Sequence, residues 1–380
     1  ERDGSPKLLA MGVRDKRAGA DFRFGRPMAF GQGANRYTYD GSRRIGDSPV
    51  YVRGEHDSPE AESVPRGTLQ VLVSAPLEIP RNSSGRLELA QWIASRDNPL
   101  AARVMANRIW LQLFGTGLVP TADDFGLAGR APSHPELLDH LAIRFIDGDW
   151  SVKKLIRYLV TSRVYQLSST STKLSMEVDP GNVLLWRMSP RRLDAESLRD
   201  GMLAISGLLD LRPQVGSAVA TQGEGPVDRF GYVPISRSIN DPENVHRSIY
   251  LPIVRDNLPE SLALFDAADP SLITARRQQT TVPSQGLYLL NNEFVVRVSD
   301  AAAQSLLKIG DQEERIQTAF LRFFGREPTD EEIDGAREFI ASYQNDAPPR
   351  TRFGRPSGEL ERWSAFCQAL FASAEFQYRK

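Results

Sequence analysis

The sequence predicts a mainly α-helical protein: a multi-helix body with a small β-containing N-terminal segment and a long irregular loop. Apolar residues recur at helical spacing between helix-capping residues from residue 84 to residue 169, and again from about residue 284 to the end. Strand-like runs occur only near the N-terminus and around residue 250. Between Asp210 and His246 the periodicity disappears, over a length at which structureless loops are uncommon.

The N-terminal segment, residues 1–80, is rich in Gly, Arg and Asp and contains two short strand-like runs, residues 7–13 and 49–53. Strands this short are not stable alone and must pair with each other or pack on a helical body. We therefore expect a small β-containing appendage with a loosely ordered loop.

The helix at residues 99–114 has the clearest boundaries in the sequence. Asn98 is a preferred N-cap residue, Pro99 suits the first helical position, and Gly115 stands where a left-handed residue commonly ends a helix. The segment is apolar on nearly every side, which is typical of a buried helix.

Further helix starts follow at regular intervals. Ser133 with Glu136 matches a capping box, and Ser151 begins an amphipathic helix with an apolar stripe. Another helix is expected at residues 189–207, with Leu198, Met202 and Ile205 facing inward. In the C-terminal part the capping pattern recurs at Asp311 with Glu314 and at Thr329 with Glu332, and residues 249–254 resemble a short apolar strand.

These patterns divide the chain into an appendage (1–80), a helical region (81–209), a long loop (210–247) and a C-terminal helical region (248–380). We expect residues 81–380 to form one packed body, with two packed subdomains as the alternative. A chain of 380 residues can bury a core without metals or disulfides.

Composition excludes several classes of protein. Lys and Arg total 47 against 48 Asp and Glu, so no net charge attracts nucleic acid or anionic lipid. Cys367 is the only cysteine, which excludes an internal disulfide and a covalently attached haem. No apolar run reaches the length of a membrane helix. Because the chain begins at Glu1 without an initiator Met, we expect it to be a piece of a longer precursor, with any export signal upstream.

Polar residues within apolar patterns are the candidates for function. Asn107 lies on the apolar face of the helix at residues 99–114, and we expect both Asn107 and its neighbour Arg108 to be enclosed. Such groups need partners, because an unpaired buried polar group costs about 1–3 kcal/mol. They either pin loop carbonyls and the turn at Asp123 and Asp124, or they contact a ligand.

Arginine pairs are a second set of candidates. Arg191 and Arg192 precede a helix that contains Asp200, and Arg276 and Arg277 follow in the second half. Arginine forks bind carboxylate, sulfate or phosphate groups with two hydrogen bonds, so these residues would suit an anionic sugar or headgroup. The alternative is that the arginines are solvated or paired within the chain.

Histidine and acidic clusters are weaker candidates. His134 stands at a helix start, where a structural hydrogen bond competes with a catalytic or metal-binding role. The four histidines of the chain show no metal-ligand spacing, and no cofactor is expected within it. Residues 55–62 contain Glu55, His56, Asp57, Glu60 and Glu62, which suit either a divalent cation or a solvated loop. Common signatures of hydrolases, phosphate-binding loops, zinc proteases and dinucleotide sites are absent.

From about residue 49 to the C-terminus the chain contains a series of ordered motifs, which include Asn107-Arg108-Ile109-Trp110, Asp123-Asp124-Phe125-Gly126, Ser133-His134-Pro135-Glu136, Pro190-Arg191-Arg192-Leu193, Arg199-Asp200, Thr280-Thr281-Val282-Pro283-Ser284-Gln285 and Gly325-Arg326-Glu327-Pro328-Thr329. Together these motifs resemble the planctomycete-type domain of unknown function 1553, the C-terminal part of large exported proteins associated with cytochrome c modules.

The resemblance implies an extracytoplasmic protein, periplasmic or secreted, with haem available only through an upstream module. It implies no activity. The leading hypothesis is a helical module that binds a protein partner or an anionic ligand, such as an anionic glycan, around Asn107, Arg108, His134, Arg191 and Arg192. The alternative is an enzyme acting on extracellular polysaccharide, sulfated or not, with Asp123, Asp124 or Asp200 as acid or base.

Overall fold

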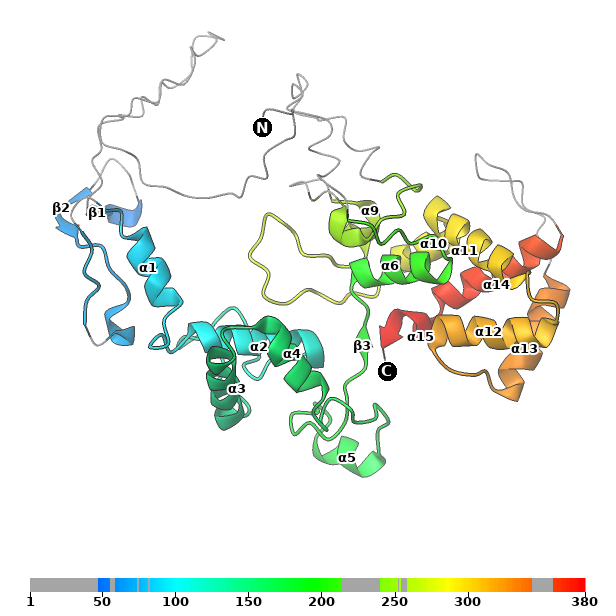
Figure 1. The fold of residues 1–380 in the computed structure, drawn as a ribbon, viewed down its shortest axis with the longest axis horizontal. Coiled ribbons are helices and arrows are strands. Elements are labelled where there is room, and N and C mark those ends of the chain that lie inside the picture. The colour runs from blue at the N-terminus through cyan, green and yellow to red at the C-terminus, as the bar shows by residue number, and fades with distance from the viewer. Residues whose placement is uncertain are drawn as a thin grey trace, which may run out of the picture. The chain divides into compact units, whose positions relative to one another are not determined.

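The computed structural model describes residues 47–54, 59–73, 75–80, 83–213, 240–251, 253, 258–343 and 358–379. These residues are mostly helical with a small N-terminal β segment, which confirms the predicted fold class (Figure 1). The expected strand at residues 7–13 and residues 214–239 of the expected long loop lie outside the described residues. None of the helices in the described part of the chain has the length and apolar composition of a membrane span.

The chain forms two compact units. The first contains the residues up to Ile109 together with His134–Ile156, and the second contains Trp110–Ser133 and Arg157–Lys380. The division passes through two helices, so each of these helices contributes residues to both units.

The β segment of the first unit is a two-stranded antiparallel sheet. Strand β1 (Ser48–Tyr51) pairs with β2 (Pro59–Val64), and Pro49 lies opposite Ser63. A strand was expected at residues 49–53, and the structure confirms its first part, which turns into a short 3-10 helix at Val52–Gly54. A second 3-10 turn follows at Gln70–Leu72.

Four helices contribute to the first unit: α1 (Arg86–Ile93), the start of α2 (Ala101–Phe114), α3 (Pro135–Asp147) and the start of α4 (Val152–Val160). The expected cap of α2 is confirmed, because the Asn98 side-chain oxygen accepts hydrogen bonds from the backbone N–H groups of Leu100 and Ala101 at 2.9 and 3.0 Å. An ion pair between Arg103 Nε and Asp139 Oδ1, 2.6 Å long, joins α2 to α3.

The capping box expected at Ser133 is wrong. Helix α3 begins at Pro135, and its N-cap residue is His134, whose side chain makes no capping hydrogen bond. Ser133 instead donates from its backbone nitrogen and its hydroxyl to the Leu118 carbonyl, at 2.8 and 3.3 Å. Proline disfavours the helical conformation for the residue before it, and His134 accordingly lies outside the helix with φ −136° and ψ 82°, so that the helix starts at Pro135.

The second unit contains most of the helices. They are α5 (Lys173–Val178), α6 (Ala195–Ile205), the 3-10 helix η3 (Ser248–Tyr250), α9 (Glu260–Leu264), α10 (Pro283–Asn291), α11 (Glu293–Leu306), α12 (Gln312–Phe324), α13 (Asp330–Ser342), α14 (Glu359–Ala372) and α15 (Ala374–Gln377). Helix α14 packs along α11 and also contacts α10 and α13 (Figure 1).

The core of this unit lies around α14. Trp363, Cys367 and Phe371 of α14 are fully buried, as are Val295 and Val298 of the facing helix α11. Each large apolar side chain contributes about 1.5–3 kcal/mol when it is removed from water. The only cysteine of the chain is therefore a core residue, and its burial raises the pKa of the thiol.

The strand expected at residues 249–254 is wrong for the residues described there. Ser248–Tyr250 form a 3-10 helix, held by hydrogen bonds from Tyr250 N to Arg247 O and from Leu251 N to Ser248 O at 2.9 and 3.1 Å. Local turn hydrogen bonds replace a ladder, because no neighbouring strand pairs with these residues among those described.

A two-residue strand pair closes the end of the second unit. Strand β3 (Arg191–Arg192) pairs antiparallel with β4 (Tyr378–Arg379), and the Leu193 N–H extends the ladder to the Gln377 carbonyl at 2.8 Å. The helix expected at residues 189–207 consequently begins only at Ala195. Its inward residues Leu198 and Met202 are buried, as expected.

The two expected C-terminal caps are present. Asp311 accepts from Glu314 N at 2.9 Å, and Thr329 and Glu332 form a reciprocal capping box at the start of α13. Arg326 holds both Glu332 and Glu375, at 2.6 and 2.7 Å, and so joins the start of α13 to α15. Its hydrogen bonds lower the pKa of Glu332 to about 2.

We predict that Glu332→Gln lowers the free energy of unfolding by an amount that depends on pH, because it removes this ion pair. Glutamine keeps the capping acceptor but removes the charge. Because the folded pKa of Glu332 lies below its ordinary 4.5, its stabilisation is present above about pH 4.5 and disappears as the pH falls towards 2. Urea unfolding should show the wild type more stable by about 1 kcal/mol at neutral pH and equal to the variant near pH 2. A difference that does not change with pH would contradict the assignment.

Candidate functional site

A buried arginine connects three segments of the second unit. Arg192 on β3 is 8% exposed and donates to the carbonyls of Phe265, at 3.2 Å, and of Thr280. It also forms an ion pair with Asp266, which follows α9. Arg192 thus holds the turn after α9 and the segment before α10 against the strand.

Asp266, the partner of this arginine, is also hydrogen-bonded to Thr280. Its oxygens accept from Thr280 N and Thr280 Oγ1 at 2.9 and 2.8 Å. Burial opposes ionisation of Asp266, but the hydrogen bonds from Thr280 and Arg192 outweigh burial and lower its pKa. Gln285 adds a bond from its side-chain nitrogen to the Leu264 carbonyl at 2.9 Å, and so supports the same turn.

The two arginines of the second pair, Arg276 and Arg277, differ in their surroundings. Arg277 makes two hydrogen bonds to Glu196 of α6, at 2.5 and 2.8 Å, and these bonds raise its pKa. Burial opposes the charge on Glu196, but Arg277 lowers the pKa of this carboxyl overall. Arg276 is exposed.

Arg191 follows the same pattern as Arg192. Its Nη1 donates to the Gln112 carbonyl near the end of α2. Gly115 ends this helix with a φ of 86°, as expected, and a Cβ there would lie 3.3 Å from the Arg191 side chain. Glycine therefore serves both the left-handed backbone and the close approach of the arginine.

Arg199 and Asp200 of α6 bind the backbone that returns from the long loop. Arg199, 6% exposed, donates to the His246 carbonyl at 2.9 Å, to the Ser248 hydroxyl at 3.2 Å and to the Asn244 carbonyl. Asp200 accepts from Ser248 N and Ser248 Oγ, both at 2.7 Å. Burial lowers the pKa of Arg199, which the Asp200 charge partly offsets.

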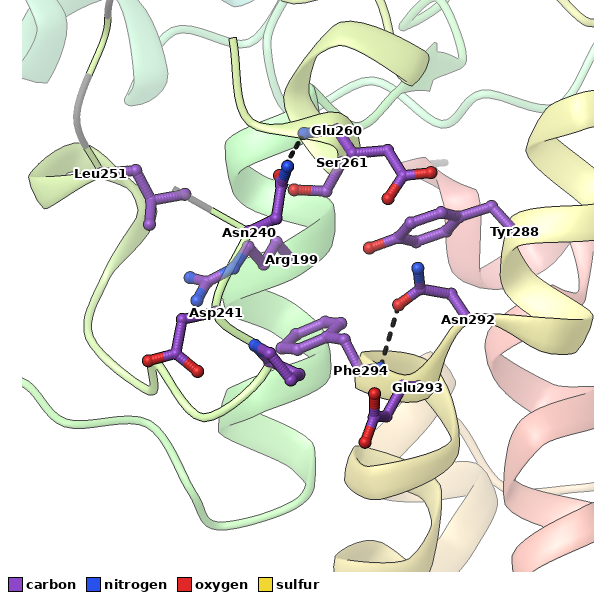
Figure 2. A pocket seen from close by; sticks show the side chains of 11 residues that line it. Arg199, Asn240, Asp241, Leu251, Glu260, Ser261, Tyr288, Asn292, Glu293 and Phe294 are labelled. Atoms are coloured by element: carbon purple, nitrogen blue, oxygen red, sulfur yellow. Dashed lines mark hydrogen bonds between the residues drawn. The ribbon is translucent and has the colours of Figure 1, made fainter. Parts of the chain in front are cut away.

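A pocket of about 230 Å³ opens beside Arg199, and we call it the α11 pocket (Figure 2). Tyr288 and Asn292 lie on one side of it, and Asn240 and Asp241 face them from the other (Figure 2). Its lining residues are Arg199, Asn240, Asp241, Pro242, Leu251, Glu260, Ser261, Tyr288, Asn292, Glu293 and Phe294.

Local structure fixes several of these side chains. Asn292 caps α11 by accepting from Phe294 N at 2.9 Å, and Asn240 accepts from Glu260 N at 2.7 Å, as the dashed lines of Figure 2 show. The Arg199 guanidinium lies over the Phe294 ring, 5.2 Å from its centre. The pocket is thus formed by the ends of helices and by the segment that returns from the loop.

The charges of the α11 pocket are mostly negative. Asp241, Glu260 and Glu293 line it, and none of the three pairs with an oppositely charged group among the described residues. Among the described lining residues, Arg199 is the one cationic side chain, and carbonyl and hydroxyl oxygens already accept its hydrogen bonds. Burial and the neighbouring Glu260 raise the pKa of Tyr288 to about 12, so its phenol is a neutral hydrogen-bonding group at physiological pH.

A second pocket, of about 540 Å³, contains three residues singled out in the sequence: Asp123, Arg276 and Arg277. We call it the Asp123 pocket. The other lining residues are Pro120, Ala122, Ala263, Asp266, Ala267, Ala268, Asp269, Leu272, Ile273, Thr274, Ala275 and Gln278. Asp124 is not a lining residue, and its Oδ1 accepts from Gly126 N at 2.7 Å within its own turn.

Three of the expected site residues belong to the first unit. Asn107 is fully buried, as expected, and it has an interaction partner. The expected burial of Arg108 is wrong, because its side chain is exposed. Arg108 faces outward although its neighbours Asn107 and Ile109 are both buried. His134 is half-buried. Arg191 and Arg192, expected beside them, belong to the second unit.

Most residues of the α11 pocket were not predicted as site residues from the sequence. Asn240 and Asp241 lie within the aperiodic loop expected at residues 210–247, and Tyr288 and Phe294 belong to helix patterns in which aromatic residues suggest core. The one available signal was Asn292 before Glu293, an N-cap followed by an acidic first turn.

Within the described residues, no three His, Cys, Asp or Glu side chains are arranged to hold a metal ion. This finding does not cover the acidic cluster at residues 55–62 that the sequence suggested as a cation site. Glu55, His56 and Asp57 lie outside the described residues, and so do the side chains of Glu60 and Glu62.

The family described as PSD1, a protein of unknown function (DUF1553), matches residues 85–340. The chain belongs to this family. No curated protein and no solved structure matches it. Both pockets and the networks around Arg192 and Arg199 lie within the residues that match the DUF1553 family.

We predict that Asp266→Asn destabilises this DUF1553 chain by about 3 kcal/mol, because it leaves the Arg192 charge buried without a counter-charge. Asparagine tolerates the φ of 62° at this position and still accepts from Thr280. The matched control is Asp269→Asn, since Asp269 is exposed and accepts from Ser271 N at 2.7 Å.

Chemical denaturation of both variants measures the difference. The control should remain within about 0.5 kcal/mol of the wild type. Equal, small losses in the two variants would mean that the buried ion pair contributes nothing to stability beyond its hydrogen bonds.

Proposed function

We propose that the chain is a ligand-binding module of an exported, extracytoplasmic assembly, and that the α11 pocket holds the ligand. The observation that supports this proposal best is the pocket lining, in which amide, hydroxyl, carboxylate and aromatic groups converge on one small cavity. Export and the assembly rest on the resemblance of the chain to cytochrome-c-associated proteins. Haem would come only from a module outside this chain.

The chemistry of the lining favours a neutral ligand rich in hydroxyl donors. Asp241, Glu260 and Glu293 are acceptors and repel anions, whereas Arg199 has already given its hydrogen bonds to the protein. Asn240, Ser261 and Tyr288 add neutral donors and acceptors. This balance differs from the anionic glycan expected from the sequence.

The size of the pocket narrows the choice further. At about 230 Å³ it lies below the range of about 300–1,000 Å³ that suits drug-sized ligands. One sugar ring fits this scale, and the Phe294 and Tyr288 rings offer apolar surface to its C–H face. We therefore propose the terminal sugar of a neutral glycan as the ligand, in preference to a protein segment.

Ligand-observed NMR and equilibrium dialysis with glucose, mannose, N-acetylglucosamine and glucuronic acid test the proposal. We predict binding of at least one neutral sugar and at least about tenfold weaker binding of the glucuronate, a difference of about 1.4 kcal/mol. Tyr288→Phe, which removes one hydroxyl of the lining, should weaken the neutral sugar about fivefold.

The matched control is Arg276→Ala, which removes an exposed arginine outside the α11 pocket and should leave the affinity unchanged. Tighter binding of glucuronate than of the neutral sugars, lost in Arg276→Ala, would overturn the proposal and restore an anionic ligand.

A second candidate function is hydrolysis of an extracellular polysaccharide. It is favoured by one observation: Glu260 and Glu293, the first residues of α9 and α11, line the same pocket. Glycoside hydrolysis uses two carboxylates about 5–10 Å apart. The carboxylates expected from the sequence do not form this pair, because Asp200 is bound to Ser248, Asp124 to its own turn, and Asp123 lines the other pocket.

If the chain is such an enzyme, we predict that Glu260→Gln and Glu293→Gln each lower the release of reducing sugar from neutral polysaccharides by more than about 100-fold. Both variants should still bind sugar, since glutamine keeps an acceptor oxygen. Binding without detectable turnover in the wild-type chain would leave the binding module as the function and exclude this candidate.

A further inference from the structure

One wall of the α11 pocket is held partly by contacts outside the pocket lining. Asn240, Asp241 and Pro242 form this wall, and the chain then continues to Ser248 in η3. Among residues 243–248, none lines the pocket. The position of the wall therefore depends on what holds the segment 240–248, which we call the wall segment.

We propose that Arg199 and Asp200 are positioning residues of the ligand site, because they fix the far end of the wall segment to α6. This inference rests on the proposed function and deepens it. Two consecutive side chains of one helix make five hydrogen bonds to four groups within residues 244–248. Four of these five bonds are 2.7–3.2 Å long.

The Ser248 hydroxyl is the shared element of this anchor. It accepts from Arg199 Nη1 at 3.2 Å and donates to Asp200 Oδ1 at 2.7 Å, and the residue is 3% exposed. In the folded chain this hydroxyl connects the two anchoring side chains. Ser248 itself does not line the pocket.

Two further hydrogen bonds hold residues of the wall directly. Arg297 of α11 donates to the Pro242 carbonyl at 2.6 Å, and Asn240 accepts from the Glu260 N–H at 2.7 Å. Arg199 continues from the anchor to the pocket itself, since its guanidinium stacks on Phe294. We expect a shift at Ser248 to reach Asp241, because the Asp241 carbonyl accepts from Asn244 N at 3.1 Å within the same segment.

Asp200 gains a different role from the one the sequence suggested. It was expected as an acid or base, yet its Oδ1 accepts two hydrogen bonds from Ser248, and it is not a lining residue. Arg247 Nε lies 3.5 Å from its other oxygen. Asp200 orders the protein chain and does not face the ligand.

Ser248→Ala tests the anchor without touching the lining. The variant removes the shared hydroxyl and keeps the bond from the backbone N–H to Asp200. Ser248→Thr restores the hydroxyl. The matched control is Ser299→Ala in α11, which removes another buried serine hydroxyl, one that donates to the Val295 carbonyl at 2.7 Å.

Hydrogen exchange of the ligand-free protein is the first readout. We expect the amides of Asp241 and Glu243 to exchange about fivefold faster in Ser248→Ala, but not in Ser248→Thr or Ser299→Ala. The Kd for glucose, measured by equilibrium dialysis, is the second readout, and it should rise about tenfold in Ser248→Ala alone.

Unchanged exchange at Asp241 and Glu243 in Ser248→Ala would overturn the proposal, whatever the melting temperature. Faster exchange with an unchanged Kd for glucose would overturn it as well, because the wall would then move without consequence for the site. If the wild type binds no sugar, the proposed function fails, and exchange at Asp241 and Glu243 alone decides whether the anchor holds the wall.

Discussion

The stability of the second unit depends on hydrogen-bond and charge partners for its buried guanidinium groups. Arg192 and Arg199 are almost completely buried, and a buried charge without partners destabilises a protein by several kcal/mol. Each is satisfied by segments distant in sequence: Arg192 by residues 265–280, and Arg199 by residues 244–248. These segments carry little regular structure, so the arginines define their positions.

This constraint also determines the character of the two pockets. Because Arg192 and Arg277 are paired with Asp266 and Glu196, they offer little binding capacity to an external anion. Meanwhile three carboxylates of the α11 pocket have no cationic partner among the described residues. A site rich in acceptors and poor in free cations follows, and it suits a ligand that donates hydrogen bonds.

Local features of the fold were predictable where the signal is contained within one turn of the chain. The caps at Asn98, Asp311 and Thr329 and the left-handed Gly115 occur as expected, since each depends on a few neighbouring residues. The cap predicted at Ser133 is wrong, because the helix begins at Pro135 with His134 as its N-cap residue. The candidate site was harder to predict, since Tyr288 and Phe294 carry the same pattern as core residues.

The sequence by itself determined the helical class, the caps at Asn98, Asp311 and Thr329, the burial of Asn107 and the family of the chain, because periodicity, caps and ordered motifs depend on the order of the residues alone. Only the tertiary structure decided which carboxylate meets which arginine, that Arg108 is exposed, and that Asp200 binds the backbone of Ser248. These outcomes join residues tens of positions apart. Their energies depend on distance and burial in three dimensions, which no local pattern encodes.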